Sequence, residues 1–235
     1  MIVCANFKTN HTRGKTKEYL TTLQSHIQNC KSQVMVFPAA SSLLSWEGSV
    51  CIGAQNAYAA TDGAFTGEIG SLHLDEFGIK TILIGHSERR HILKESQKQI
   101  QEKFDFYKKR EFVIVYCVGE DLDVKQQGED AVVAYIKAQL EGIDTTYENL
   151  IVAYEPVWAI GTGLTPTVEE IEQIHTKLKG ILNNKPLLYG GSVKVGNAQA
   201  IMSCNNVDGV LVGSGALVVE DFIQMVNTAE KIKGE

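Results

Sequence analysis

Short apolar runs recur along the chain and alternate with segments in which apolar residues repeat every three or four positions. Most of the runs are continuously apolar and rich in Val, Ile, Leu and Tyr. That pattern is typical of strands covered on both faces, as in a parallel sheet. Eight strands are therefore predicted, at residues 2–6, 34–37, 50–54, 81–84, 112–118, 150–154, 187–189 and 207–212.

The segments between these runs predict amphipathic helices. Five apolar stripes are well defined, and three weaker helices are predicted at residues 42–46, 71–77 and 196–204. The stripes are formed by Tyr19, Leu23, Ile27 and Cys30; by Ile100, Phe104 and Tyr107; by Val132, Ile136, Leu140 and Ile143; by Val168, Ile171, Ile174, Leu178 and Ile181; and by Phe222, Val226 and Ala229.

Strand and helix alternate eight times, with no linker, repeat or low-complexity segment between them. This alternation indicates an α/β protein with a parallel sheet and right-handed crossovers. We expect a single domain over residues 1–235 that closes into a (β/α)8 barrel, the TIM barrel, for which this length is usual. An open doubly wound sheet is the alternative, although it usually has fewer units.

Composition narrows the classes of partner and the compartment. A formal net charge of −6 disfavours nucleic acid as a partner. The apolar run at the amino terminus is too short for a signal peptide, and no run approaches the ~20 apolar residues of a membrane span. We therefore expect a cytoplasmic protein. The five cysteines are widely spaced and include no CxxC pair, which favours reduced thiols over a disulfide framework or a zinc site.

Residues 153–163 predict a lid. Glu155 ends an apolar run, and Pro156 stops the strand there and fixes the backbone where the loop begins. The next four residues are too apolar for an ordinary surface loop, and Gly161-Thr162-Gly163 supplies a flexible hinge. Such a lid would keep water from Glu155 when shut. Its predicted members are Pro156, Val157, Trp158, Ala159, Ile160, Gly161 and Thr162.

Polar side chains follow the other predicted strands where each strand ends. In a parallel barrel the carboxyl ends of the strands share one rim, and that rim carries the chemistry. An amide, an ammonium, an imidazole and carboxylates would meet there, beside two glycine-rich turns at residues 190–192 and 213–215. The groups are Asn6, Lys8, His86, Glu120 and Glu155.

These segments together resemble the triosephosphate isomerases. The resemblance rests on Asn6-Phe7-Lys8, Ile84-Gly85-His86-Ser87-Glu88, the lid, Tyr189-Gly190-Gly191-Ser192 and Leu211-Val212-Gly213, in order over nearly the whole chain. It implies an enzyme that interconverts dihydroxyacetone phosphate and D-glyceraldehyde 3-phosphate through an enediol(ate), in glycolysis and gluconeogenesis. It also implies that no cofactor is needed, and the sequence shows no dinucleotide fingerprint after a strand and no metal-ligand spacing around His86.

The resemblance implies the family's established roles at the matching positions. Glu155 would be the base, His86 a neutral ring that polarises the carbonyl, and Lys8, assisted by Asn6, would stabilise negative charge. The helix that begins at Ser87 would keep the ring neutral, and Ile160 and Leu211 would close over Glu155 and raise its basicity. Backbone N–H groups would bind phosphate at Gly161, Ser192, Gly213 and Ser214.

Two further residues would assist, and one residue of the phosphate site departs from the family pattern. Ser87 would hold Glu155 when the lid is open, and Glu88 would pair with Lys8. Ser214 stands where family members usually carry glycine. Its backbone N–H could therefore sit differently, or its side chain could add a hydroxyl to the phosphate site.

The segment at residues 63–68 implies a homodimer. In the family it forms a loop that enters a neighbouring subunit, so Thr66 would support Asn6 across the interface; an ordinary surface loop is the alternative. Two other functions stay open from the residues alone. One is a Schiff-base aldolase with a reactive lysine in the pocket, and the other is a phosphometabolite-binding protein without catalysis.

Overall fold

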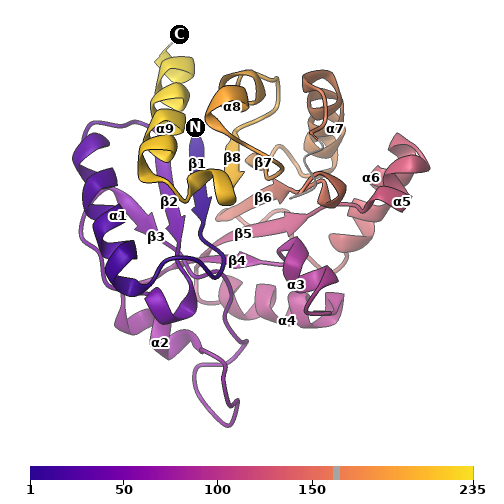
Figure 1. The fold of residues 1–235 in the computed structure, drawn as a ribbon. Helices are drawn as coiled ribbons and strands as arrows, with labels where there is room; N and C mark the ends of the chain where they lie inside the picture. The colour runs from indigo at the N-terminus through magenta and orange to yellow at the C-terminus, as the bar shows by residue number, and fades with distance from the viewer. Residues whose placement is uncertain (161–164, 235) are drawn as a thin grey trace.

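The computed structural model describes residues 1–160 and 165–234 and shows a ring of parallel strands surrounded by helices (Figure 1). The strands form one eight-stranded sheet in the order β3-β2-β1-β8-β7-β6-β5-β4. They are β1 (Ile2–Asn6), β2 (Gln33–Phe37), β3 (Val50–Ile52), β4 (Thr81–Ile84), β5 (Val113–Val118), β6 (Leu150–Tyr154), β7 (Leu187–Tyr189) and β8 (Gly209–Val212).

Ala54 closes the barrel. β3 and β4 stand at the two ends of the strand order, and an isolated parallel bridge joins Ala54 to Ile82. The Ala54 N–H donates to the Thr81 carbonyl at 2.9 Å, and the Leu83 N–H donates to the Ala54 carbonyl at 2.8 Å. The predicted (β/α)8 barrel is therefore confirmed, and the open doubly wound sheet is wrong.

Four strands, β1, β4, β6 and β7, have the predicted bounds, and the other four differ by one or two residues. β8 begins at Gly209, two residues later than predicted. The backbone of Gly209 lies so close to Ile2 of β1 that no side chain fits there. Every strand pair is parallel, so all the carboxyl ends lie at one rim of the barrel.

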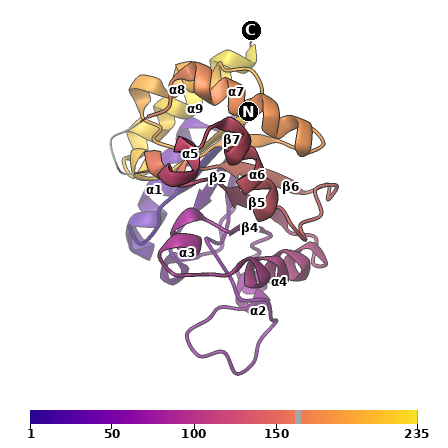
Figure 2. The ribbon, with the colours of Figure 1, turned by 90° about the vertical axis from the view of Figure 1, so that its right-hand side faces the viewer.

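Helices cover the outside of the barrel (Figure 2). The described helices are α1 (Arg13–His26), α2 (Ser71–Glu76), α3 (Ser87–His91), α4 (Gln97–Lys108), α5 (Leu122–Gln126), α6 (Glu129–Gln139), α7 (Val168–Ile181), α8 (Val195–Met202) and α9 (Val219–Gly234), with short 3-10 helices η1 (Ala40–Ser42), η2 (Val157–Ala159) and η3 (Ser214–Ala216). Three of the five apolar stripes lie wholly on α4, α7 and α9. The other two run past their helices, because Ile27 and Cys30 follow α1 and Leu140 and Ile143 follow α6. Two of the three weaker predictions correspond to α2 and α8.

The helix predicted at residues 42–46 is wrong. Only η1 forms there, and Leu43 ends it by adopting an extended conformation with φ −62° and ψ 144°. Leu43 and Trp46 contact the core without a continuous helix between them. Their spacing therefore reflects two separate contacts with the core, not one helical face.

Two apolar layers explain why most strand sequences are continuously apolar. The inner layer fills the barrel, and the outer layer lies between the sheet and the helices. In β5, for example, Val115 and Cys117 point inward while Ile114 and Tyr116 pack outward. All five cysteines are free thiols, as predicted. Among the described residues, no helix has both the length and the apolar character needed to cross a bilayer.

Candidate active site

A cavity of about 260 Å³ lies at the carboxyl rim of the barrel. The ends of β1, β4, β6, β7 and β8 contribute its walls, so residues far apart in the sequence meet there. Its lining includes Asn6, Lys8, His86, Glu155, Ile160, Gly190, Ser192, Leu211, Gly213 and Ser214. Nine of these ten residues, all except Gly190, were given a role from the sequence, and they share one cavity.

Glu155 is only 2% exposed, and both of its carboxylate oxygens have partners. Oε1 lies 3.1 Å from Nε2 of His86, and Oε2 accepts a hydrogen bond from the Ser87 N–H at 3.0 Å. The backbone of Ser87, rather than its hydroxyl, thus holds the carboxylate. Two glycines make room for it, because a Cβ at Gly119 would collide with the Glu155 carbonyl and one at Gly190 would press on its side chain.

His86 caps the amino terminus of α3. Its Nδ1 accepts a hydrogen bond from the Glu88 N–H at 3.3 Å, so in the neutral ring the proton is on Nε2 and points at Glu155. Burial lowers the His86 pKa, but the Glu155 carboxylate raises it by more than burial lowers it, so the His86 pKa lies above its ordinary value. For Glu155, burial raises the pKa, whereas His86, the Ser87 N–H and Lys8 together hold it below the ordinary value.

In this arrangement the two pKa values therefore shift in the directions opposite to those that the resemblance implies for the working site. The physical reason is the direct contact between the two side chains, since each stabilises the charged form of the other. Sequence reasoning missed it because the two residues come from different strands.

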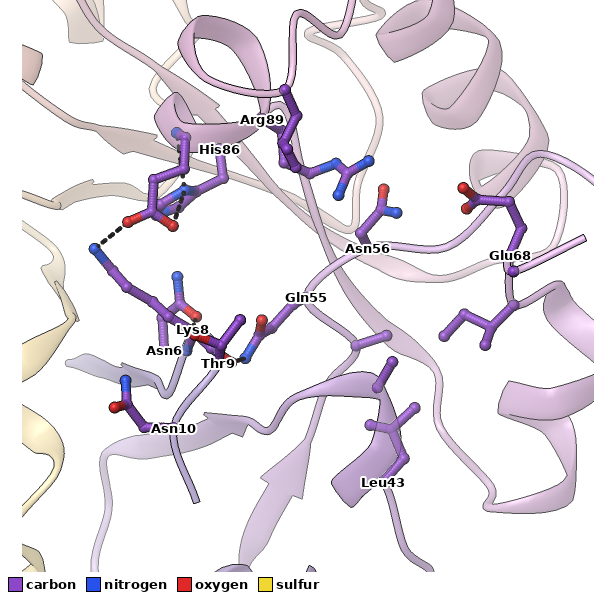
Figure 3. Close-up of a pocket in the computed structure, with 16 residues that line it drawn as sticks. Asn6, Lys8, Thr9, Asn10, Leu43, Gln55, Asn56, Glu68, His86 and Arg89 are labelled. Atoms are coloured by element: carbon purple, nitrogen blue, oxygen red, sulfur yellow. Dashed lines mark hydrogen bonds and ion pairs between the residues drawn. The ribbon is translucent and has the colours of Figure 1, made fainter. Parts of the chain in front are cut away.

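Lys8 sits on a tight turn after β1, in the left-handed region with φ 53°. Its N–H donates to Asn6 Oδ1 at 3.0 Å, and the Gln55 amide donates to its carbonyl at 2.8 Å. The ammonium lies 2.6 Å from Glu88 Oε1, which is the expected ion pair. Figure 3 shows Lys8 extending from this turn toward the strand end that carries His86.

The described part of the lid is braced at two points. The Trp158 indole N–H donates to Glu120 Oε1 at 2.7 Å, and the Ser192 hydroxyl donates to the Ala159 carbonyl at 2.7 Å. The Tyr154 hydroxyl reaches the same Glu120 oxygen at 3.0 Å. Sequence reasoning placed Glu120 at a strand end but gave it no role. The tryptophan inside the lid was the available signal, because a buried indole N–H needs an acceptor and Glu120 supplies it.

The two glycine-rich turns pack together at one side of the cavity. Ser214 starts η3 and is exposed, and a Cβ at Gly215 would collide with the Val193 carbonyl. Gly213 lies under the Lys8 side chain, and a Cβ at this position would lie 3.3 Å from Lys8 Cε. The Lys8 ammonium therefore lies beside the backbone of Gly213.

Ser87, Glu88 and lid residues 156–159 do not line this cavity, and neither does Thr66. Gly161 and Thr162 lie outside the described residues. Thr66 is exposed on the loop before α2, which projects from the body of the molecule (Figures 1 and 2). Within residues 1–160 and 165–234, no group of three or more His, Cys, Asp or Glu side chains is arranged to hold a metal ion.

Comparison with known proteins gives one consistent answer. A family model described as triosephosphate isomerase matches residues 1–229. The triosephosphate isomerase of Sulfurimonas denitrificans is 56% identical over 234 residues, covering 99% of this chain and 97% of that protein. That of a Sulfurovum species is 54% identical over 228 residues, covering 96% of this chain and 99% of that protein. That of a Nitratiruptor species is 51% identical over 233 residues, covering 99% of this chain and 100% of that protein.

Proposed function

Because this chain belongs to the triosephosphate isomerase family and so interconverts dihydroxyacetone phosphate and D-glyceraldehyde 3-phosphate, we propose that Glu155, His86, Lys8 and Asn6 carry its chemistry. The observation that supports this assignment is the meeting of a buried carboxylate, an imidazole and an ammonium in one cavity, with Glu155 Oε1 3.1 Å from His86 Nε2.

Glu155 is the base that moves the proton. It removes a proton from carbon 1 of dihydroxyacetone phosphate, and the electron pair of that C–H bond becomes the carbon–carbon double bond of the enediolate. The carboxyl group then returns its proton to carbon 2. The hydroxyl proton on the oxygen of carbon 1 passes to the oxygen of carbon 2 by way of His86, so carbon 1 becomes the aldehyde and carbon 2 carries the hydroxyl. A carbon acid beside a carbonyl is weak, so the base must be close and shielded from water.

The contact between Glu155 and His86 explains how each group becomes competent. Burial is the largest single influence on both pKa values, and it raises that of Glu155 and lowers that of His86. When Glu155 leaves the ring to reach the substrate carbon, the mutual stabilisation is lost and burial dominates. Glu155 then becomes a stronger base, and His86 a neutral Nε2–H donor to the substrate carbonyl oxygen.

Lys8 and Asn6 stabilise the charge that develops on the substrate oxygens. Lys8 is fixed for this task by its strained turn and by its ion pair with Glu88. Membership of the isomerase family disfavours the Schiff-base aldolase, which would need a lysine that acts as a nucleophile in the pocket.

The remaining roles concern phosphate and the lid. Backbone N–H groups of Gly161, Ser192, Gly213 and Ser214 bind the phosphate, assisted by the neighbouring Lys8 ammonium. The lid, residues 156–162, excludes water and suppresses loss of phosphate from the enediolate.

Replacement of Glu155 by aspartate tests the assignment. Glu155→Asp retracts the carboxylate by about one carbon–carbon bond, and we expect kcat to fall about 100-fold or more with little change in KM, because the near-attack geometry is lost. A coupled isomerase assay measures both constants, and exchange of the substrate's carbon-bound hydrogen with solvent should slow in parallel. Glu169→Asp, an exposed carboxylate on α7, is the matched control. An unchanged kcat in Glu155→Asp would remove Glu155 from the mechanism.

We further propose that the protein is a cytoplasmic homodimer. Its five free thiols suit a reducing compartment. The projecting loop at residues 63–68 supports the dimer, because Phe65 at its tip is 42% exposed, and the loop reaches away from the barrel (Figure 2). In the dimer, Thr66 of one copy supports Asn6 of the other.

A further inference from the structure

We propose that Lys125 is a positioning residue that ties together the two ends of the lid and thereby controls how well the lid retains the enediolate. This inference rests on the proposed function, which assigns that retention to the lid. Lys125 lies on α5, a short helix outside the catalytic cavity, and it contacts Trp158 within the lid and Glu170 on the helix that follows the lid.

The first contact is with Trp158 in the amino-terminal half of the lid. The Lys125 ammonium lies 5.2 Å from the centroid of the indole ring, within the range of a cation–π interaction. The ring edge is held separately, because Nε1 donates to the buried Glu120 carboxylate at 2.7 Å. One partner on the face and another at the edge together fix the orientation of the indole.

The second contact is with Glu170, in the first turn of the helix that follows the lid. Lys125 Nζ lies 3.0 Å from Glu170 Oε1, and the other oxygen of Glu170 accepts from the Thr167 N–H at 2.9 Å. Thr167 caps α7 in return through its side chain, at 3.2 Å from the Glu170 N–H. The Thr167 N–H and then Lys125 hold the Glu170 pKa below its ordinary value, so this carboxylate stays ionised.

The arrangement makes α5 a fixed point for both ends of the lid. Asp121 caps α5 by accepting from the Val124 N–H at 3.0 Å, so the helix begins directly after the short link that carries Glu120. Val124 packs against the core and holds α5 to the barrel. A cavity of about 180 Å³ between Glu120, Lys125, Trp158 and Glu170 gives the indole room to shift if the ammonium is lost. Removing the charge should therefore loosen the lid without touching the catalytic groups.

The test compares two charge-removing variants and one conservative one. Lys125→Met keeps the apolar stem and removes the ammonium, whereas Lys125→Arg keeps both the ion pair and the contact with the ring. Lys177→Met is the matched control, because Lys177 on α7 is also partly exposed but pairs with Glu129 and Asp130 at 2.8 and 3.5 Å. The chain has two tryptophans, so each variant is made in a Trp46→Phe background, which leaves Trp158 as the only fluorescent indole.

The measurements are the ratio of inorganic phosphate released to substrate isomerised, and the Trp158 emission with and without phosphoglycolate. For Lys125→Met we expect the ratio to rise about three- to tenfold and the emission to shift, since each lost contact weakens the lid's hold by a factor of this order. Lys125→Arg should restore both readouts, and Lys177→Met should match the parent. An unchanged ratio in Lys125→Met, an equal rise in Lys177→Met, or no rescue by arginine would overturn the proposal.

The emission measurement separates this proposal from the assignment of the base. Trp158 reports the lid whether or not the chemistry proceeds. If Glu155→Asp left kcat unchanged while Lys125→Met still shifted the emission and raised the ratio, the proposed base would be wrong and the role of Lys125 would stand.

Discussion

His175 shows what burial does to an imidazole that has no carboxylate against it. Its side chain on α7 is completely buried, and Nδ1 lies 3.1 Å from the Asn206 carbonyl, to which it donates. Burial lowers the His175 pKa to about 4. His86 is almost as buried, yet the Glu155 carboxylate raises its pKa. The charged partner, not the depth of burial, therefore decides the sign of the shift.

The low pKa of His175 predicts acid sensitivity of the fold. Above pH 6.5 the ring is neutral in both the folded and unfolded states, and its stabilising contribution is fully present. As pH falls from 6.5 toward about 4, the unfolded state binds the proton first, so stability is lost over that range. The loss reaches about 2 kcal/mol at pH 5.

We expect wild-type protein to lose about 2 kcal/mol more than His175→Gln between pH 8 and pH 5. Urea denaturation at a fixed protomer concentration measures the free energy of unfolding at each pH. His26→Gln, a change of an exposed histidine on α1, should follow the wild type. Parallel pH profiles for wild type and His175→Gln would show that the ring is not held neutral by burial.

At the residue scale the sequence predicted positions better than it predicted electrostatics. Glu155 and His86 could be placed at strand ends because apolar runs stop there. Their mutual contact and opposite pKa shifts depend on how the ends of β4 and β6 face each other across the rim, which no local pattern encodes. The role of Glu120 was missed for the same reason, since its partner Trp158 comes from a later loop.

At the scale of elements, the end of β5 is shaped around the residue that ends β6. The Glu155 N–H donates to the Val118 carbonyl at 2.7 Å, and the backbone of Glu155 then passes so close to Gly119 that no side chain fits there. Glycine is required at this position for close approach rather than for flexibility. The position of the catalytic carboxylate thus depends on a residue in a neighbouring strand end.

Gly119→Ala should therefore displace Glu155. We expect kcat to fall about 100-fold through misplacement of the base, and stability to drop by about 1–3 kcal/mol from overpacking. Gly180→Ala is the matched control, because Gly180 lies in α7 with open space around its Cβ position. That change should stabilise the protein by about 0.5–1 kcal/mol and leave kcat unaltered. Normal turnover in Gly119→Ala would mean that the strand ends are not coupled in this way.

The periodicity of apolar residues predicted the helices that bury an apolar face, and it missed α5, which buries none. α5 has no buried residue, so it leaves no apolar stripe in the sequence; its Asp121 cap and the contacts of Lys125 hold it. The converse error at residues 42–46 arose where buried Leu43 imitates one turn of a stripe. Periodicity detects burial, and burial is not always helical.

At the scale of the whole molecule, counting alternating units was enough to predict the barrel, but not how it closes. The closing contact is a bridge through Ala54, which lies just beyond the last residue of β3. Net charge is equally uninformative about the site. The chain carries −6 overall, yet a phosphate dianion would meet the Lys8 ammonium and backbone N–H groups at the rim.

The surface beside the site has features that fit the proposed dimer interface. A cavity of about 560 Å³ opens next to the catalytic one and shares Asn6, Lys8 and His86 with it (Figure 3). Leu93 on its edge is 62% exposed, and the neighbouring Ile92 is 70% exposed. The projecting loop, whose Phe65 ring packs on its own Tyr58 at 4.3 Å, offers an apolar tip of matching character.

Phe65→Asp tests this arrangement. Burying a carboxylate in an apolar interface costs more than the aromatic contact contributes, so we expect the dissociation constant of the dimer to rise at least about 100-fold. Sedimentation velocity measures the oligomeric state, and Leu122→Asp, at an apolar residue 45% exposed on α5, should leave it unchanged. Activity of Phe65→Asp should fall as the protein is diluted into the monomeric range, because the turn that carries Asn6 and Lys8 loses its support from the partner.

Thr66→Val separates assembly from that support. Valine matches threonine in size and lacks only the hydroxyl, so the dimer should persist while kcat falls, if the hydroxyl of one copy holds Asn6 of the other. A dimer that keeps full activity with valine would assign the interface to Phe65 and the apolar edge alone. A monomeric wild type at the concentrations of the assay, with full turnover, would show that the active site is complete within a single chain.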